Sequence, residues 1–357
     1  MPDNSKLFMQ NLGFRSQAKR YNKNEQHLFQ TLYYRDPGYY KFFRETLEAS
    51  LPSKNTILKW RPLKILQTGL IRVVMAYLQH IHQSLTEEDR KVILCFDEMD
   101  GRRGLFYEEK QDRIIGFEFL TGKSNKLAKK ILTLMIRGVN GKLGNIIIAN
   151  YATTSGISGS ELPLLIPYII RALRDIKYEV IATTCDQSAV NRKAFSILKA
   201  TPDEPYFFVD DYKVWALFDI PHLFKSARIS FLERKMTSKN GNISGDLVKK
   251  AFYLHKDLAT NCFSKLSNVH FEYDTFEKMR VDLAVQILSE SVASSLEHLK
   301  NDQNTIKFVR TMNVLFDIMN AKTVNDSNEN KRGVSASNIE RLIEIYEYLG
   351  SIEVHIF

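Results

Sequence analysis

The sequence predicts an α/β protein: a mixed β-sheet with flanking helices, preceded by a short helical leader and followed by an all-helical domain. Three observations support this order. Apolar runs of strand length begin at Lys91, helical and strand patterns then alternate, and only amphipathic helical stretches follow Pro221. We therefore expect three regions, which span residues 1–90, 91–220 and 221–357.

Length and composition set the broad class. The chain has 357 residues, of which 44% are hydrophobic and 25% charged, with 16 Gly and 9 Pro. Such values are typical of a folded protein with a core, and they exclude collagen-like, low-complexity and largely disordered chains. Fifty Lys and Arg against 41 Asp and Glu leave a net charge of +9. This excess favours a polyanionic partner, although many basic proteins bind nothing acidic.

The cysteines and the termini suggest where the protein acts. Cys95, Cys185 and Cys262 are too few and too widely spaced for a disulfide framework or a four-cysteine zinc site. No segment offers about 18 uninterrupted apolar residues, the length of a membrane span. The first residues also lack the pattern of a signal peptide. We expect a soluble, intracellular protein with no membrane partner.

The leader, residues 1–90, is aromatic and basic. Pro52 and Ser53 interrupt one helical pattern, and Thr56 lies at the start of another. This break predicts a helix-turn-helix pair. Apolar residues at helical spacing over 63–85 predict a longer amphipathic helix that leads into the next domain.

The middle of the chain carries the strand patterns. A continuous apolar run over 91–99 predicts the first strand, and short strands over 104–110 and 113–120 would complete an antiparallel meander. The elements expected next are a helix around 127–136, a strand over 144–152, a helix over 161–175, a strand over 178–186, a helix over 189–198 and strands over 205–210 and 213–219. Three antiparallel strands followed by alternating helices and strands is the order of an RNase H-like fold, with helices on both faces of the sheet.

Strand signals cease beyond Pro221. Amphipathic helical stretches follow, separated by polar loops such as those over 237–245 and 323–335. The last third of the chain is therefore predicted to be all-α.

Two aspartates mark the ends of predicted strands. Asp97 closes the first strand and Asp186 closes a later one, and ligands bind beyond the carboxyl ends of strands in open α/β sheets. Two carboxylates at one edge can share Mg²⁺ ions, which support phosphodiester chemistry by the two-metal mechanism. Alternation along the strand turns Glu98 to the face opposite Asp97, and Asp100 is expected in the turn. The competing interpretation is that each aspartate only makes local turn hydrogen bonds.

Several short motifs decide between these interpretations. They are, in chain order, LPSKNTILKW (51–60), CFDEM (95–99), TTCDQSAVNRKAF (183–195), FDIPHLFKSAR (218–228) and FDIMN (316–320). Together they resemble the successive motifs of the P-element-type transposases, including their THAP-domain relatives in animals. The resemblance covers nearly the whole chain from about Leu51 onward, and the first motif resembles the helix-turn-helix region before the catalytic domain of that family.

The resemblance implies an RNase H-like catalytic domain of the DDE type, interrupted by a helical insertion domain that binds GTP and helps to hold DNA. Asp97 and Asp186 match the first two catalytic, metal-binding acids. Lys225 matches the lysine that meets the nucleotide phosphate, a role that suits a point charge. Asp317 and Asn320 match the pair that reads the guanine base, and their spacing puts them on one helical face. Mg²⁺ and GTP are thus the implied cofactors, and the nucleus the implied location.

The same residues have a plainer interpretation. Without the resemblance, Lys225 would be an ordinary helical cation, and Asp317 and Asn320 would be the polar edge of a packing helix.

Two parts of the family pattern are not found. The first cysteine is Cys95, so no zinc-coordinating module of three cysteines and a histidine precedes the predicted strands. The third catalytic acid, a glutamate in a motif like LNQDxLE, has no match. The last acids are Glu340, Glu344, Glu347 and Glu353, and the first three belong to an amphipathic helix. We expect weak binding of a second metal, no strand cleavage by this chain alone, and an apolar face of the sheet left uncovered.

Three functions therefore compete. The chain is a P-element-like transposase or a remnant of one, or a non-catalytic, domesticated or repressor-like protein that binds DNA and GTP, or a helical interaction domain on a degenerate nuclease fold. Its expected partners are DNA and a guanine nucleotide, and the sequence leaves open whether it forms a homo-oligomer.

Overall fold

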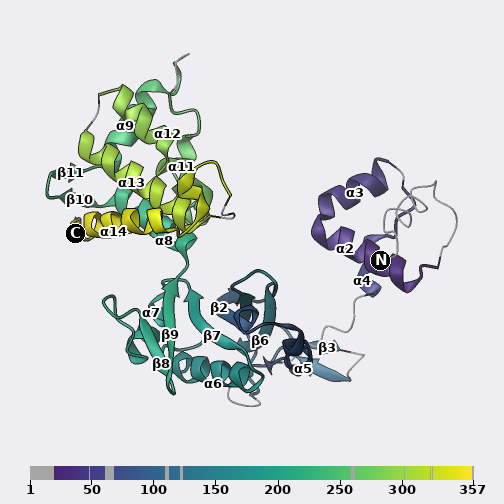
Figure 1. Ribbon diagram of the computed structural model, residues 1–357. Helices are drawn as coiled ribbons and strands as arrows, with labels where there is room; N and C mark the ends of the chain where they lie inside the picture. Colours follow the sequence, from purple (N-terminus) through teal and green to yellow (C-terminus); the bar gives the residue numbers. More distant parts are fainter. Residues whose placement is uncertain are drawn as a thin grey trace. The chain divides into compact units, whose positions relative to one another are not determined.

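The structure is a computed structural model, and it describes residues 20–47, 49–60, 68–108, 112–120, 124–258, 262–300, 302–321, 323 and 325–355 (Figure 1). Its contacts divide the chain into two compact units, Met1–Gln67 with Tyr107–Ile115 and Thr68–Phe106 with Gly116–Phe357. Among the described residues, no helix combines the length and apolar character needed to cross a membrane.

The described residues of the first unit form three helices and a two-stranded sheet. They are α2 (Lys23–Arg35), α3 (Pro37–Glu45), α4 (Lys54–Lys59), β3 (Phe106–Glu108) and β4 (Arg113–Ile115). Phe29, Tyr40 and Ile57 form its core, and the Tyr40 hydroxyl donates to the Pro52 carbonyl at 2.8 Å. The predicted break is confirmed: Ser53 Oγ accepts from the Thr56 N–H at 3.1 Å and so caps α4.

The second unit begins with a seven-stranded mixed sheet in the order β1-β6-β5-β2-β7-β9-β8. The strands are β1 (Gly69–Leu70), β2 (Lys91–Asp100), β5 (Lys130–Gly138), β6 (Ile146–Thr153), β7 (Glu179–Cys185), β8 (Tyr206–Val209) and β9 (Tyr212–Phe218). β2, β7 and β9 are parallel neighbours, whereas β5 and β6 pair in antiparallel fashion on the other side of β2. The mixed sheet of the predicted fold is confirmed.

Three helices cover this sheet: α5 (Arg72–Ile81), α6 (Leu162–Asp175) and α7 (Ala189–Ile197). Buried side chains of all three helices form one hydrophobic cluster with alternate residues of the strands, such as Leu94 and Leu134. Phe195 of α7 contacts the ring of Phe96 on β2. The helices therefore pack against one face. The sequence predicts helices on both faces, but no described helix between β1 and β9 covers the second.

The start of the sheet domain differs from the predicted boundary at residue 90. β1 pairs with β6, and Leu78 of α5 is fully buried in the core of the sheet. The Tyr178 hydroxyl also donates to the Leu78 carbonyl at 3.0 Å. The long helix predicted over 63–85 is partly wrong, because the described part of that segment is a short strand followed by α5. Its residues 63–67 lie outside the described residues.

The predicted helix around 127–136 is wrong, because this segment forms strand β5. Leu132, Leu134 and Ile136 are buried and alternate with residues on the other face. The segment is apolar on both sides, so its pattern fits either period, and pairing with β2 and β6 decides the outcome. The predicted meander is wrong for the same reason: β5 and β6 partner β2, while β3 and β4 form a separate sheet.

In the helical domain that follows, the residues that the structure describes form six longer helices, one short helix and one small sheet. Its elements are α8 (Ile220–Glu233), β10 (Lys235–Ser238), β11 (Gly241–Ile243), α9 (Gly245–His255), α10 (Thr275–Lys278), α11 (Val281–Ile287), α12 (Glu290–His298), α13 (Gln303–Met319), α14 (Ala336–Gly350) and β12 (Glu353–His355). Two short 3₁₀ turns described in this domain are η4 (Asn268–His270) and η5 (Glu329–Arg332). Two others, η1 (His82–Ser84) and η2 (Glu88–Arg90), lie between α5 and β2 in the sheet domain.

The helical domain is not purely α. Its three strands pair in the order β11-β10-β12. The loop predicted over 237–245 is instead the β10–β11 hairpin, in which Gly241 adopts φ +132°, a conformation that favours glycine. Strands this short carry too few residues for an alternating pattern to be visible in the sequence.

A buried arginine organises the interior of the helical domain. Arg228 of α8 is 0% exposed, and its guanidinium donates to the carbonyls of Glu277 at 3.2 Å and His270 at 3.4 Å. It also lies 4.5 Å from the centre of the Tyr273 ring. A buried cation must be hydrogen-bonded to be tolerated. Arg228 therefore ties α8 to the segment 270–277.

Asp89 connects the start of β2 to the β5–β6 hairpin. Its buried carboxylate accepts from the Thr86 hydroxyl at 2.7 Å and from the Lys142 ammonium at 2.9 Å. These bonds lower the pKa of Asp89 to about 2, with the Lys142 bond as the largest cause. Because the pKa of Asp89 is lower in the folded state, its ionised carboxylate stabilises the fold at pH values above the ordinary aspartate pKa of about 4. This stabilisation is lost as the pH falls toward 2.

Asp89→Asn should lower the midpoint of thermal unfolding at pH 7, because it removes a charge that the Lys142 ammonium stabilises. The difference from the parent should shrink between pH 4 and about 2 as the parent aspartate protonates. Circular dichroism melts across this pH range measure it. Asp203→Asn, at an exposed position, is the control. A difference that stays constant down to pH 2 would contradict the assignment.

Candidate functional site

Two of the predicted site residues lie at the carboxyl ends of neighbouring parallel strands, Asp97 near the end of β2 and Asp186 directly after β7. Cys95 of β2 pairs with Thr184 of β7, so Asp97 and Asp186, two residues further on, reach the same carboxyl edge of the sheet. This edge is where open α/β sheets bind their ligands. The strand register thus brings together two carboxylates that are far apart in the sequence.

A third aspartate at this edge was not singled out by sequence reasoning. Cys185 of β7 pairs with Phe218 of β9, and the next residues are Asp186 and Asp219. The Asp219 N–H donates to the Cys185 carbonyl at 2.8 Å, which holds it beside the end of β7. The signal that could have found it is its position directly after a predicted parallel strand.

The three aspartates act on the same buried thiol. Cys185 is 4% exposed, and burial raises its pKa strongly, because the thiolate would lose its hydration. The negative charges of Asp186, Asp97 and Asp219 raise it further. This shared influence agrees with the strand register in placing all three carboxylates around the end of β7.

The residues around Asp97 follow the expected alternation. Asp97 is exposed, and its Oδ1 accepts from the Glu98 N–H at 2.8 Å. The Glu98 side chain is used elsewhere: it accepts from the Ile157 N–H at 2.8 Å and from the Lys130 ammonium at 3.2 Å. The prediction that Asp100 lies in a turn is wrong, because β2 extends through Asp100, which pairs with Lys130 of β5.

Asp186 is held by the start of α7. Its Oδ1 accepts from the Asn191 side-chain amide at 2.6 Å and from the Ser188 N–H at 3.0 Å. The local turn hydrogen bonds of the plainer interpretation are therefore present. They engage one oxygen, and Oδ2 has no hydrogen-bond partner within the described part of the chain. Such bonds orient the carboxylate and leave one oxygen open to a ligand.

The donor chemistry at this edge fits a hard cation. Carboxylate oxygens suit Mg²⁺, which keeps several waters and is often held by only one or two carboxylates. Over the residues that the structure describes, no group of three or more His, Cys, Asp or Glu side chains is arranged to hold a metal ion. Asp97 and Asp186 would thus hold such a cation as a pair, with water as the remaining ligands.

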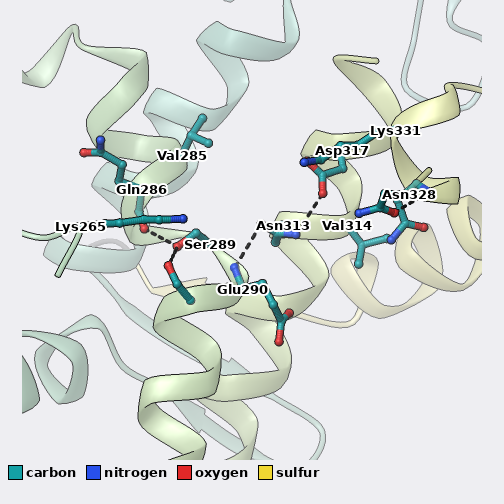
Figure 2. Close-up of a pocket in the computed structure, with 12 residues that line it drawn as sticks. Lys265, Val285, Gln286, Ser289, Glu290, Asn313, Val314, Asp317, Asn328 and Lys331 are labelled. Carbon is teal, nitrogen blue, oxygen red and sulfur yellow. Dashed lines mark hydrogen bonds between the residues drawn. The ribbon is translucent and has the colours of Figure 1, made fainter. Parts of the chain in front are cut away.

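The helical domain contains a separate cavity of about 450 Å³ (Figure 2). It lies among the end of α11, the start of α12, the second half of α13 and η5. The residues that line it are Lys265, Val285, Gln286, Ser289, Glu290, Ser291, Asn313, Val314, Asp317, Asn328, Asn330 and Lys331.

Asn313 connects two walls of this cavity. Its Oδ1 accepts from the Glu290 N–H at 3.1 Å, and its Nδ2 donates to Asp317 Oδ2 at 3.3 Å, as the dashed lines in Figure 2 show. The Ser289 hydroxyl at the N-cap position of α12 donates to the Gln286 carbonyl at 2.7 Å and does not cap the helix. The cavity therefore joins a carboxylate to the positive end of a helix.

The charges of the cavity are partly balanced from outside. Glu290 accepts from Arg310 at 2.9 Å, so its negative charge is neutralised away from the cavity. Lys265 and Lys331 supply two cations, and Figure 2 shows the Lys265 side chain reaching toward the space between Ser289 and Asn313. An anionic ligand with hydrogen-bond donors for Asp317 suits this arrangement.

One of the three predicted nucleotide residues lines this cavity. Asp317 does, whereas Lys225 and Asn320 are not among its lining residues. Lys225 is 8% exposed on α8, and Asn320 is an exposed residue at the C-cap of α13, with φ −109° and ψ 18°. The Asn320 N–H still donates to the Phe316 carbonyl at 2.9 Å, and the shared face of Asp317 and Asn320 stays a prediction. Sequence reasoning missed Lys265, which lies in a loop, and Lys331, which lies on η5, because neither stands in a recognisable motif.

Comparisons with known proteins agree with both parts of the second unit. Residues 66–199 match the TNP-like RNase H N-terminal domain, and residues 221–332 match the TNP-like GTP-binding insertion domain. The Transposable element P transposase of Drosophila melanogaster is 23% identical over 282 residues, which cover 76% of this chain and 35% of that protein. DNA transposase THAP9 of Homo sapiens is 26% identical over 318 residues, which cover 82% of this chain and 34% of that protein. The chain spans about a third of the length of these relatives.

A solved structure shows the same fold. The Drosophila P element transposase strand transfer complex matches with a TM-score of 0.71 at 20% identity, over 97% of this chain and 76% of that chain. Both domain matches belong to one family and occur in the order that the structure shows. The chain belongs to the P-element-type transposase family and combines an RNase H-like domain with a GTP-binding insertion domain.

Proposed function

We propose that this chain is a P-element-like transposase or a remnant of one, which retains a metal-binding pair and a nucleotide site but does not cleave DNA by itself. The observation that carries the proposal is the strand register that brings Asp97 and Asp186 to one edge of an RNase H-like sheet. Proteins of this family act on DNA, which the chain's net charge of +9 suits. A nuclear location follows from that substrate.

Asp97 and Asp186 are the residues that would hold Mg²⁺. Asp97 offers an exposed carboxylate, and Asp186 offers the oxygen that Asn191 and Ser188 leave open. When bound, the metal supplies positive charge for phosphodiester chemistry. The α7 contacts hold the Asp186 carboxylate in one orientation before any ligand arrives, which reduces the entropy lost on binding.

The lack of cleavage is proposed from the acids that this chain offers. Glu340, Glu344 and Glu347 lie on α14, and Glu353 lies on β12, which pairs with β10. All four belong to elements of the helical domain and follow no strand of the large sheet. Asp219 stands beside Asp186, but the described acids form no three-residue metal cluster.

Guanine nucleotide binding is proposed for the cavity of the helical domain. The free oxygen of Asp317 can accept from the N1 and N2 hydrogens of guanine, while Asn313 holds its other oxygen. Lys265 and Lys331 can meet the phosphates. The nucleotide contacts of Lys225 and Asn320 stay predictions. Calorimetric titrations of Lys225→Ala and Asn320→Ala with GTP would test them.

A second candidate is a non-catalytic protein that binds DNA and a guanine nucleotide. It is favoured by the contrast between the two sites. The cavity has a carboxylate and two cations among its lining residues, whereas the sheet edge has two of the three acids that the family resemblance implies. Metal titration separates the two candidates, because both bind a guanine nucleotide and only the first retains the Mg²⁺ site of Asp97 and Asp186.

Asp97→Asn and Asp186→Asn should each weaken binding of Mn²⁺, used as a spectroscopic substitute for Mg²⁺, by at least about tenfold, since each removes one of two anionic ligands. Titration followed by electron paramagnetic resonance measures free Mn²⁺ directly. Asp203→Asn is the matched control, at an exposed loop position. Identical isotherms for all four proteins would refute the metal site.

The purified chain should not nick supercoiled DNA in Mg²⁺ or Mn²⁺, because one essential carboxylate of the catalytic unit is missing. Gel electrophoresis after long incubation measures this. The decisive control for contamination is Asp97→Asn. Nicking by the parent that disappears in the variant would show that the chain is an active nuclease after all.

Asp317→Asn should reduce GTP affinity by about 10- to 100-fold, because a hydrogen bond to a charged group contributes about 1.5–3 kcal/mol. Preference for GTP over ATP should also fall, since adenine has no N1 hydrogen to offer the carboxylate. Calorimetric titrations with both nucleotides measure these effects. Glu344→Gln, at an exposed position on α14, is the control. Unchanged affinity and selectivity in Asp317→Asn would place the base elsewhere.

A further inference from the structure

The loop between β6 and α6, residues 154–161, lies at the same edge of the sheet as Asp97 and Asp186. Asp97 pairs with Thr133 of β5, and Thr133 pairs with Asn150 of β6, so β6 runs in the direction of β2 and also ends at the carboxyl edge. The loop has the sequence TSGISGSE, which is rich in glycine and serine. Small residues of this kind allow a ligand to approach the backbone closely.

Glu98, the neighbour of Asp97 in the chain, fixes one half of this β6–α6 loop. Its Oε1 accepts from the N–H of Ile157, whose side chain is buried in the core of the sheet domain. Gly156 adopts φ +97°, and a Cβ at this position would lie 2.7 Å from Glu98 Oε2. The Lys130 ammonium, 3.2 Å from the same oxygen, balances the charge of Glu98. The loop is therefore held against the strand that carries Asp97.

Lys193 of α7 contacts the other half of the loop. A Cβ on Gly159 would lie 2.8 Å from Lys193 Cδ and 3.0 Å from Lys193 Cβ, so the aliphatic stem of the lysine lies against this glycine. Lys193 is exposed and forms no ion pair with the residues that the structure describes. A stem that is already packed loses less conformational freedom when the ammonium group binds a ligand.

The charges at this edge decide which ligand can bind there. Four carboxylates lie along it, those of Asp97, Asp186, Asp219 and Glu161. Without a bound cation, they repel an anion. When Asp97 and Asp186 hold Mg²⁺, the negative charge of this pair is offset. The Lys193 ammonium and the amino-terminal ends of α6 and α7, which both begin at this edge, then favour an anion.

We propose that Lys193 and the β6–α6 loop bind a backbone phosphate of DNA beside Asp97 and Asp186. The proposal rests on the proposed function, because the phosphate binds there when these two aspartates hold Mg²⁺. The Lys193 ammonium donates to the phosphate, and the exposed side chains of Ser155 and Ser160 supply further donors along the loop. Glu98 acts as a positioning residue, since it holds the loop in place.

A phosphodiester of a long polymer fits this edge better than a free phosphate ion. A phosphodiester carries a single negative charge, and Lys193 supplies a single cation beside the metal pair. The residues lie along an open edge of the sheet, so a strand can continue past the site in both directions. DNA also makes many phosphate contacts at once, which compensates for the weakness of each exposed contact.

Lys193→Gln in the full chain should weaken binding of a fluorescein-labelled DNA duplex in Mg²⁺ by about three- to tenfold. It should also reduce the slope of log affinity against log salt by about 1, because one phosphate contact is lost. Fluorescence anisotropy at several KCl concentrations measures both effects. Lys193→Arg keeps the charge and should retain most of the affinity. Lys177→Gln is the matched control, because Lys177 is an exposed lysine just before β7, at the opposite edge of the sheet.

The same titrations in EDTA separate this site from general attraction between lysines and DNA. Without metal, the carboxylates of the edge repel the phosphate, so Lys193→Gln should bind DNA as the parent does. An effect of Lys193→Gln in Mg²⁺ no larger than that of Lys177→Gln overturns the proposal, as does an equal loss in Mg²⁺ and EDTA. Displacement of the DNA by inorganic phosphate at constant ionic strength also overturns it, because the free ion would then be the ligand.

The metal titrations show which proposal has failed. If Asp97→Asn and Asp186→Asn weaken Mn²⁺ binding while Lys193→Gln binds DNA as the parent does, the phosphate site is refuted and the metal pair stands. If the two aspartate variants bind Mn²⁺ as the parent does, the metal pair is refuted and the phosphate site with it.

Discussion

The parallel register of β2, β7 and β9 is the constraint on which the rest of the sheet domain depends. Because residue pairing along β2 and β7 is set by backbone hydrogen bonds, a slip of one residue would turn Asp97 to the other face. The buried alternation of Val92, Leu94 and Phe96 prevents such a slip, since it would expose three apolar side chains. The core that stabilises the sheet thus also positions the carboxylates at its edge.

A buried polar network plays the corresponding part in the helical domain. Arg228 fixes the segment that contains His270, and His270 Nε2 lies 2.8 Å from Gln286 Oε1 beside the cavity. The Ser267 N–H donates to His270 Nδ1 at 3.0 Å, so the neutral ring, with its hydrogen on Nε2, satisfies both neighbours. Burial lowers the pKa of His270 and favours this form. The hydrogen bonds of the buried His270 therefore hold the Gln286 side chain, which lines the cavity, in place.

The two halves of the second unit differ in how completely they bury their surfaces. The helical domain surrounds its core, in which Val248, Ala284 and Leu296 are fully buried. The sheet is covered on one face and open on the other, where Trp215 and Leu217 remain partly exposed.

The sequence by itself determined the mixed sheet and the break at Ser53, and it singled out Asp97, Asp186 and Asp317 as candidates, because strand periodicity and short motifs are local properties of a chain. It could not distinguish β5 from a helix, since Ile131 to Ile136 are apolar on both sides and only pairing with β2 and β6 selects the strand. Asp219, Lys265 and Lys331 acquire a place in the two sites through register and packing between distant segments. The tertiary structure decided these points because no local pattern records which residues meet in space.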